Sequence, residues 1–266
     1  MTIHTGNTDV TPEEVGFDSQ HIEFLDDFFA EMIQTGKMQA ASYLLSRDGK
    51  VFAWKSMGRL NAFEDKGDFL PDSIRPIASI TKIFTATGIM QLVQQGKIVL
   101  EQPMSSIIDE FTTPLHERIT IFHLLTHTSG LATEGGMLEA YPRNWWPEDM
   151  TRENWIKMAL EGPLESPVGT TWSYCNRGFH LLAEVIARVS GMPYDEYIRK
   201  HILAPLSMTS SFFEVPEEHK DHICVVTEWD QKHVSWIREE DGKDGTPSWW
   251  GAGGLYSTPH DLWKFG

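Results

Sequence analysis

Residues 75–94 read RPIASITKIFTATGIMQLVQ, and this stretch decides both the fold class and the chemistry that the sequence predicts. Apolar side chains recur on one helix face, at Ile83, Ala86, Met90 and Val93. This spacing predicts a helix that ends before Gly96. Ser79 and Lys82 stand three residues apart at its beginning. Because residues i and i+3 share a helix face, we expect the Lys82 amine to lie beside the Ser79 hydroxyl.

This serine and lysine form a candidate pair for nucleophilic catalysis. A serine hydroxyl is a weak nucleophile until a base takes its proton, and a partly buried lysine is such a base because burial disfavours its charged form. The backbone N–H of Ser79, at the positive end of the helix, is a natural donor to an oxyanion. The same spacing also occurs by chance on helix surfaces and at helix caps, so the pair needs further residues before it indicates a function.

Tyr174-Cys175-Asn176 is the second candidate motif. A tyrosine relays a proton when an ammonium lies beside it, and an asparagine amide can hold both a substrate carbonyl and a lysine. The alternative for an isolated pair of this kind is a loop in which both side chains satisfy their own backbone. The presence of both motifs in one chain favours the catalytic interpretation.

Further segments follow these motifs in a fixed order. The whole set is RPIASITK at 75–82, LLTHTSGL at 124–131, PVGTTWSYCN at 167–176, SGMPY at 190–194, PLSM at 205–208 and GAGGLYST at 251–258. The set resembles the serine β-lactamase-like superfamily, in the branch that holds class C β-lactamases, DD-peptidases and family VIII-type carboxylesterases. The resemblance extends from about Pro12 to Gly266, and several ordered motifs are far more specific than any one of them.

The resemblance implies an α/β (α+β) chain with the β-lactamase/transpeptidase-like fold, in which an antiparallel sheet is flanked by helices and accompanied by a mostly helical subdomain. We expect one domain over residues 1–266. Within it, residues 1–75 supply an N-terminal helix and hairpin. Residues 76–245 form a mostly helical region with the nucleophile helix, and residues 246–266 begin a C-terminal α/β part.

The resemblance also implies a serine hydrolase that works through an acyl-enzyme. Ser79 attacks an ester or amide carbonyl, and Lys82 and Tyr174 share the general-base and general-acid work. Asn176 holds the substrate and the lysine, and no metal or organic cofactor is required. The expected substrate is a small-molecule ester, as for a β-lactamase-like carboxylesterase. The alternatives are a β-lactam, a D-amino-acid peptide, and a non-catalytic or truncated member that acts as a binding module; the oligomeric state stays open.

Two departures from the family pattern affect these expectations. Ser207 stands where the family usually has glycine, which we interpret as loop variation. Members also carry a third motif, of Lys-Thr-Gly or His-x-Gly type, on a strand beyond the position of Gly266. That strand supplies a second oxyanion N–H, a donor worth about 2.7 to 4 kcal/mol. We therefore expect an incomplete sheet in this chain and a longer parent protein.

The remaining local patterns predict individual elements. Apolar residues at helical spacing predict a helix over residues 18–35. Two short apolar runs, at 41–45 and 51–54, flank an Asp-Gly turn and predict a β-hairpin. A second amphipathic helix covers residues 179–189, and residues 257–261 form a helix start with a hydroxyl cap and a proline in the first turn.

The composition is that of a globular chain. Its 266 residues include 22 Lys and Arg and 38 Asp and Glu, for a formal net charge of −16, and 41% are hydrophobic. This charge would repel a phosphate backbone, so no nucleic-acid partner is expected. No apolar run suits a membrane span and no secretory leader begins the chain, which predicts a cytoplasmic location without a membrane partner. Cys175 and Cys224 are too few for a disulfide framework, and we expect two buried thiols.

Other features have competing interpretations. His123 and His127 lie one helical turn apart, as metal ligands do, but no third ligand cluster accompanies them, and we expect His127 to tie a loop near the site. A nucleophile elbow, Gly-x-Ser-x-Gly, does not occur. The GAGG stretch at 251–254 lacks the ending of a phosphate loop and is expected to allow close backbone packing. The tryptophan pairs at 145–146 and 249–250 would line an acyl pocket or pack in the core or a lid.

Overall fold

The chain divides into two compact units. The computed structural model describes residues 1–61, 65–111, 113–132, 156–157, 159–160, 163–224 and 251–266. Unit 1 comprises Met1–Ile77, Leu203–Thr246 and Leu255–Gly266, and unit 2 comprises Ala78–Ile202 and Pro247–Gly254. The expectation of one domain with inner boundaries after residues 75 and 245 stays a prediction.

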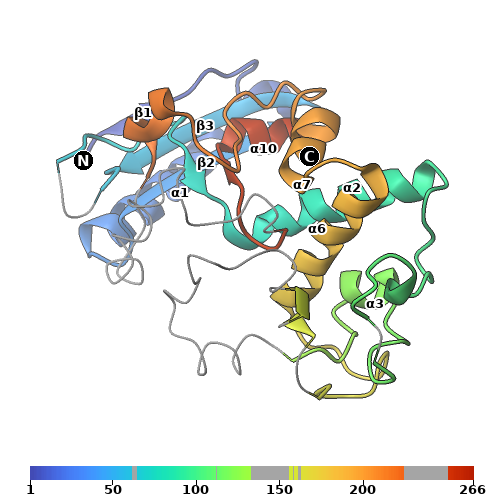
Figure 1. Ribbon diagram of the computed structural model, residues 1–266. Helices are drawn as coiled ribbons and strands as arrows, with labels where there is room; N and C mark the ends of the chain where they lie inside the picture. The colour runs from blue at the N-terminus through green and yellow to red at the C-terminus, as the bar shows by residue number, and fades with distance from the viewer. Residues whose placement is uncertain (62–64, 112, 133–155, 158, 161–162, 225–250) are drawn as a thin grey trace. The chain divides into compact units, whose positions relative to one another are not determined.

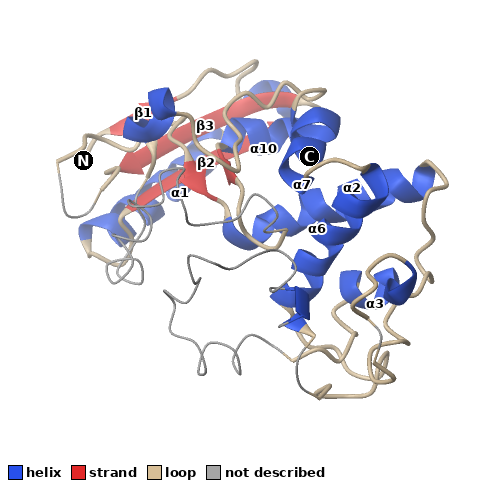
Figure 2. Ribbon diagram, viewed as in Figure 1, coloured by secondary structure: helices blue, strands red, loops and turns tan. Residues whose placement is uncertain are grey.

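Unit 1 contains a three-stranded antiparallel sheet in the order β1-β3-β2 (Figures 1 and 2). Its strands are β1 (Ile3–Thr5), β2 (Ala40–Arg47) and β3 (Lys50–Gly58). Asp48 and Gly49 join β2 to β3 with φ angles of 51° and 73°. Two positive φ angles in a two-residue turn match the right-handed twist of the strands. The predicted hairpin is therefore confirmed.

Helix α1 (Ser19–Gln34) agrees with the helix predicted over residues 18–35. The Asp18 side chain caps it by accepting a hydrogen bond from the backbone N–H of Gln20. Ile22 packs with Phe52 and Ala53 of β3 in a buried apolar cluster. This cluster buries the apolar face of the helix against the sheet, which is the main stabilisation of an amphipathic helix.

Helix α10 (Pro259–Phe265) begins at the predicted place. The Thr258 side chain accepts a hydrogen bond from the N–H of Asp261, and the proline occupies the first turn. The His260 ring stacks on Trp54 of β3 and on Trp263, with centroid distances of 5.1 and 5.4 Å. These aromatic contacts attach α10 to the sheet within unit 1.

Unit 1 also holds a two-stranded antiparallel pair, β4 (Arg75–Pro76) with β5 (Tyr256–Ser257). Among the described residues of both units, the shorter helical elements are η1 (Glu13–Val15), η2 (Ala78–Ile80), η3 (Met104–Ser106), η4 (Arg199–Leu203) and η5 (Glu217–His222). The turn at 204–207 places Ser207 at a φ of 54°. A left-handed backbone at this position explains why a family member would use glycine there.

Unit 2, where described, consists of helices and loops (Figure 2). Its helices are α2 (Thr81–Gln94), α3 (Ile121–Leu125), α6 (Asn176–Ser190) and α7 (Tyr194–Ile198). Helix α6 packs against the other three. A Cβ atom on Gly88 would lie 2.9 Å from Ile186 Cδ1, so this glycine allows α2 and α6 to approach closely.

The helix predicted between Pro76 and Gly96 exists as α2, but its buried face is not the one that carries Ile83, Ala86, Met90 and Val93. Ile83 and Met90, on the predicted core face, are 47% and 48% exposed. The buried face instead includes Phe84, Ile89 and Leu92, which have no exposed surface. Apolar residues occur on nearly all sides of α2, so spacing alone could not choose between the faces. The buried face is also the one that carries Lys82.

Two expectations from composition can be compared with the described residues. Cys175 and Cys224 are both buried and form no disulfide bond, as predicted. No helix in the described part of the chain is both long enough and apolar enough to cross a membrane.

Candidate active site

Ser79 lies at the junction between the short helix η2 and helix α2, where its side chain is exposed. The residue directly before Ser79 has a strained backbone conformation. Ala78 has a φ of 45°, in the left-handed region, which costs a residue with a Cβ about 1–2 kcal/mol. Strain of this kind is typical of functional positions because the rest of the structure must hold it in place. Here it puts the Ser79 hydroxyl at the beginning of α2.

Lys82 lies one turn after the serine and is only 7% exposed. Its Nζ atom donates hydrogen bonds to Ser79 Oγ at 3.1 Å, to Asn176 Oδ1 at 2.5 Å and to the carbonyl of Ala252 at 2.8 Å. The ring centroids of Tyr174 and Phe179 lie 4.7 and 5.6 Å from the same atom. The predicted contact between the serine and the lysine is therefore present.

Tyr174 approaches the same serine from the segment before α6. Its hydroxyl donates a hydrogen bond to Ser79 Oγ at 2.6 Å, and the residue is 40% exposed. All four predicted site residues thus meet within unit 2, although 97 positions of the sequence separate the first from the last. Ser79 Oγ is contacted by both the amine and the phenol, and Ser79 itself is exposed.

The surroundings of Lys82 suit both of its charge states. A neutral amine has two N–H donors and one lone pair, whereas an ammonium has three donors. The carbonyl oxygens of Asn176 and Ala252 can accept the two N–H groups of the neutral form. The lone pair would then point at Ser79 Oγ, and after proton transfer the third N–H would point there. The arrangement therefore needs no rotation of the amine when it takes a proton.

The GAGG stretch holds the lysine through its backbone. The Thr85 hydroxyl, one turn after Lys82, donates to the carbonyl of Gly251 at 2.6 Å and is hydrogen bonded to Tyr194 Oη at 2.7 Å. Consecutive carbonyls, at Gly251 and Ala252, are thus fixed to consecutive turns of α2. Sequence analysis predicted close packing at this glycine-rich stretch but found neither Thr85 nor Tyr194, because nothing in a sequence pairs positions so far apart.

Gly251 explains why the stretch contains glycine. A Cβ atom there would lie 2.5 Å from the carbonyl oxygen of Phe179 and 2.8 Å from Ala183 Cβ. These distances are shorter than real Cβ contacts, so the segment could not keep its position with any other residue. At Gly253 the nearest atom, in the backbone of Ala78, would be 3.8 Å away, which is an ordinary contact. Only one of these two glycines is required by space.

His127 follows α3 and contacts the tyrosine segment. The backbone N–H of Cys175 donates to His127 Nδ1 at 3.0 Å, and the N–H of Ser173 donates to the His127 carbonyl at 2.9 Å. The imidazole and phenol rings have centroids 4.7 Å apart. Burial and the charge of Lys82 lower the pKa of His127 below its ordinary value. The expected role of His127, tying a loop near the site, agrees with these contacts.

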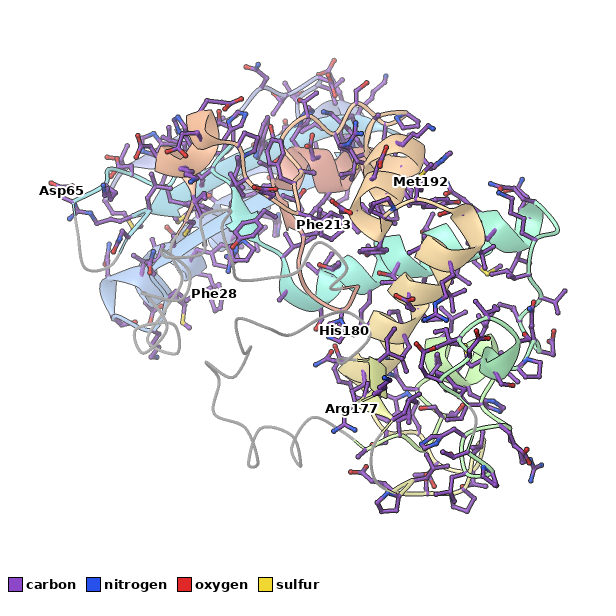
Figure 3. The ribbon with its side chains drawn as sticks, in the orientation of Figure 1. Phe28, Asp65, Arg177, His180, Met192 and Phe213 are labelled. Atoms are coloured by element: carbon purple, nitrogen blue, oxygen red, sulfur yellow. The ribbon has the colours of Figure 1, made fainter. Side chains whose placement is uncertain are left out.

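The other predicted features contribute less to the site. His123 Nδ1 interacts with Thr120 in a capping box at the start of α3. The described residues hold no group of three or more His, Cys, Asp or Glu side chains that could bind a metal ion. His180 projects from α6 (Figure 3), and burial together with the charge of Lys82 keeps its pKa well below the ordinary value. The tryptophan pairs at 145–146 and 249–250 lie outside the described residues.

Comparison with known proteins agrees with this geometry. The family model described as Beta-lactamase matches residues 25–266. The putative penicillin-binding protein PbpX of Bacillus subtilis is 29% identical over 231 residues, which are 84% of this chain and 52% of the relative. The D-alanyl-D-alanine-carboxypeptidase/endopeptidase AmpH of Escherichia coli is 30% identical over 244 residues, which are 90% of this chain and 60% of the relative.

A solved structure shows the same fold. The octameric penicillin-binding protein homologue from Pyrococcus abyssi superposes with a TM-score of 0.74 and 32% identity, covering 92% of this chain and 55% of that one. The chain therefore has the predicted β-lactamase/transpeptidase-like fold. It spans about half the length of the proteins that it matches.

Proposed function

The chain belongs to the Beta-lactamase family, a family of serine hydrolases, and we propose that it forms an acyl-enzyme through Ser79. One observation carries the proposal. Ser79 Oγ lies within hydrogen-bond distance of two groups that can exchange its proton, Lys82 Nζ at 3.1 Å and Tyr174 Oη at 2.6 Å. Nucleophile and base at this separation are the geometric signature of covalent catalysis.

In the acylation step, Ser79 Oγ forms a bond to the substrate carbonyl carbon. The hydroxyl proton passes to Lys82 or along the Tyr174 hydroxyl, and the carbonyl π electrons move onto the oxygen. The Ser79 N–H, at the beginning of α2, stabilises that oxyanion. When the oxyanion collapses, the bond to the leaving group breaks, and the leaving alcohol or amine takes the proton back from the same pair.

In the deacylation step, water repeats the sequence. Its oxygen attacks the acyl carbonyl while one proton passes to the lysine and tyrosine pair. The bond to Ser79 Oγ then breaks, the serine regains a proton, and the carboxylic acid leaves. Asn176 keeps Lys82 oriented throughout and has an N–H₂ group that can donate to the substrate carbonyl. Neither step calls for a cofactor.

We propose an ester as the substrate class. An alcohol is a better leaving group than an amine, so cleavage of an ester depends less on a general acid that protonates the leaving group. A β-lactam and a D-amino-acid peptide use the same nucleophile and the same proton relay. The relatives include a carboxypeptidase and a penicillin-binding protein. A β-lactam and a D-amino-acid peptide are therefore the alternative substrates.

The experiment is covalent labelling read by intact mass. The chain is incubated separately with a 4-nitrophenyl ester, a penicillin and a fluorophosphonate, and Ser79→Ala is treated in parallel. We expect an adduct that is absent from Ser79→Ala, with turnover of the ester. Turnover of the penicillin instead would identify a β-lactamase. Labelling that survives in Ser79→Ala, or no labelling by any reagent, would contradict the proposal, and the latter would favour a binding module.

A further inference from the structure

We propose that His127 is a positioning residue for Tyr174, and that its neutral imidazole keeps the tyrosine hydroxyl on Ser79. The inference rests on the proposed function, because it concerns how one half of the proton-transfer pair is held in place. Its test is therefore designed so that the two can fail separately.

His127 holds the tyrosine segment on both sides of Tyr174, once through its backbone carbonyl and once through its imidazole. The backbone N–H groups of Ser173 and Cys175, the two neighbours of Tyr174, donate to the carbonyl and to Nδ1 of His127, at 2.9 and 3.0 Å. Between these two bonds the phenol ring lies against the imidazole, at a centroid distance of 4.7 Å and an interplanar angle of 31°. The imidazole therefore acts on Tyr174 in two ways, through the bond from the Cys175 N–H and through the contact between the two rings.

The imidazole itself is tightly placed. His127 has a φ of 58°, a left-handed conformation that few residues other than glycine, asparagine, aspartate and histidine adopt readily. The Phe179 ring of α6 lies 5.1 Å from it, and the Trp172 ring meets it edge-on at 6.0 Å. These contacts leave the ring nitrogen Nδ1 directed at the tyrosine segment.

The hydrogen bond to Nδ1 exists only while the ring is neutral. A protonated imidazole carries a hydrogen on both nitrogens, so Nδ1 would face the Cys175 N–H as a second donor. The titratable groups that face the ring in the described part are Lys82 of α2, and Tyr174 and Cys175 of the segment before α6. Burial and the positive charge of Lys82 lower the pKa of His127. The bond is therefore kept at neutral pH and lost in acid.

Two variants separate positioning from mere packing. His127→Asn keeps an acceptor, Oδ1, in reach of the Cys175 N–H and tolerates the positive φ, but it cannot titrate. His127→Ala removes the acceptor. His123→Asn is the matched control, since it removes another titratable histidine, four residues earlier on α3, whose ring interacts with Thr120 instead. Circular dichroism checks that each variant is folded.

The measurement is the rate of Ser79 labelling by a fluorophosphonate, followed by intact mass across acid and alkaline pH. The wild-type chain and His123→Asn should lose labelling rate as the pH falls below 6.5, the ordinary histidine pKa. His127→Asn should lack that histidine-dependent loss and stay within about fivefold of wild type at pH 8, whereas His127→Ala should fall by about 10- to 100-fold.

The outcomes are distinguishable. If His127→Asn keeps the acid loss of the wild-type chain, or a folded His127→Ala labels at the wild-type rate, the positioning role is refuted while the proposed function stands. If the wild-type chain is not labelled at any pH, the proposed function is refuted and this inference with it. Should His127→Ala fail to fold, His127→Asn alone decides the question.

Discussion

Replacing Gly251 with alanine tests whether the backbone of the GAGG stretch positions the lysine. The added Cβ atom would lie 2.5 Å from the Phe179 carbonyl oxygen and 2.8 Å from Ala183 Cβ. Both neighbours belong to the core of α6, so the segment around residue 251 must move instead. That movement withdraws two carbonyl acceptors, the one that binds Thr85 at 2.6 Å and the one that binds Lys82 at 2.8 Å.

The magnitude follows from two contributions. Overpacking a buried position costs about 1–3 kcal/mol of folding free energy. A hydrogen bond to a charged group is worth about 1.5–3 kcal/mol. If half or more of that bond energy serves to orient Lys82 in the acylation transition state, the rate falls by about 4- to 160-fold, at 1.36 kcal/mol for each factor of ten. The Gly251→Ala variant should thus lose both stability and labelling rate.

The assay compares Gly251→Ala with Gly253→Ala by thermal melting and by the rate of fluorophosphonate labelling. An alanine at position 253 would have its nearest neighbour at 3.8 Å, so its stability should stay within about 0.5 kcal/mol of wild type. A Gly251→Ala variant with the wild-type melting temperature and labelling rate would refute the packing argument. Equal losses in both variants would show that the effect is not specific to the crowded glycine.

Three further predictions use other contacts. Asn176→Asp keeps the side-chain shape but places a carboxylate beside Lys82 Nζ, which favours the charged ammonium form of the lysine. Labelling of Ser79 should therefore require a higher pH than in the wild-type chain. An unchanged pH profile of labelling would contradict this. Ser207→Gly should raise the free energy of unfolding by about 0.5 kcal/mol, because glycine adopts a φ of 54° without strain. The control Ser105→Gly, at a position where φ is not positive, should lower the free energy of unfolding. Urea titration measures both. The folded chain should lose stability as the pH falls below 6.5, because the unfolded state then binds protons that buried histidines resist; melting temperatures that stay flat between pH 7 and pH 5 would argue against it. The histidines with pKa values lowered chiefly by burial are His116, His123, His127, His180 and His260.

Local signals in the sequence predicted those elements whose stability is local. The apolar spacing over 18–35, the Asp-Gly turn and the hydroxyl cap at 257–258 each act within a short segment, and the structure has α1, the hairpin and α10 at those places. By contrast, β1 has three residues and β4 two, too short for an alternating pattern to identify. Their pairing partners lie far along the chain, so a single sequence does not reveal them.

The buried face of α2 illustrates a different limit. Spacing selected Ile83 and Met90 for the core, yet both are nearly half exposed. A helix that is apolar on most sides satisfies several helical periodicities at once, and tertiary packing decides which one is buried. Here the close approach of α6 at Gly88 buries the face with Phe84 and Ile89, and it brings Lys82 inward with them.

The site as described depends on that same packing. Ser79, in η2, and Lys82, in the first turn of α2, are three residues apart along consecutive helical turns, so helix geometry alone predicted their contact. Tyr174 and Asn176 reach Ser79 and Lys82 only because the beginning of α6 packs on α2. The sequence alone does not show that these two segments lie close together. Lys82 and Tyr174, whose side chains hydrogen bond to Ser79 Oγ, both belong to unit 2. A substitution that loosens α6 from α2, such as one that adds a Cβ at Gly88, should therefore reduce labelling of Ser79 without touching any residue that bonds to it.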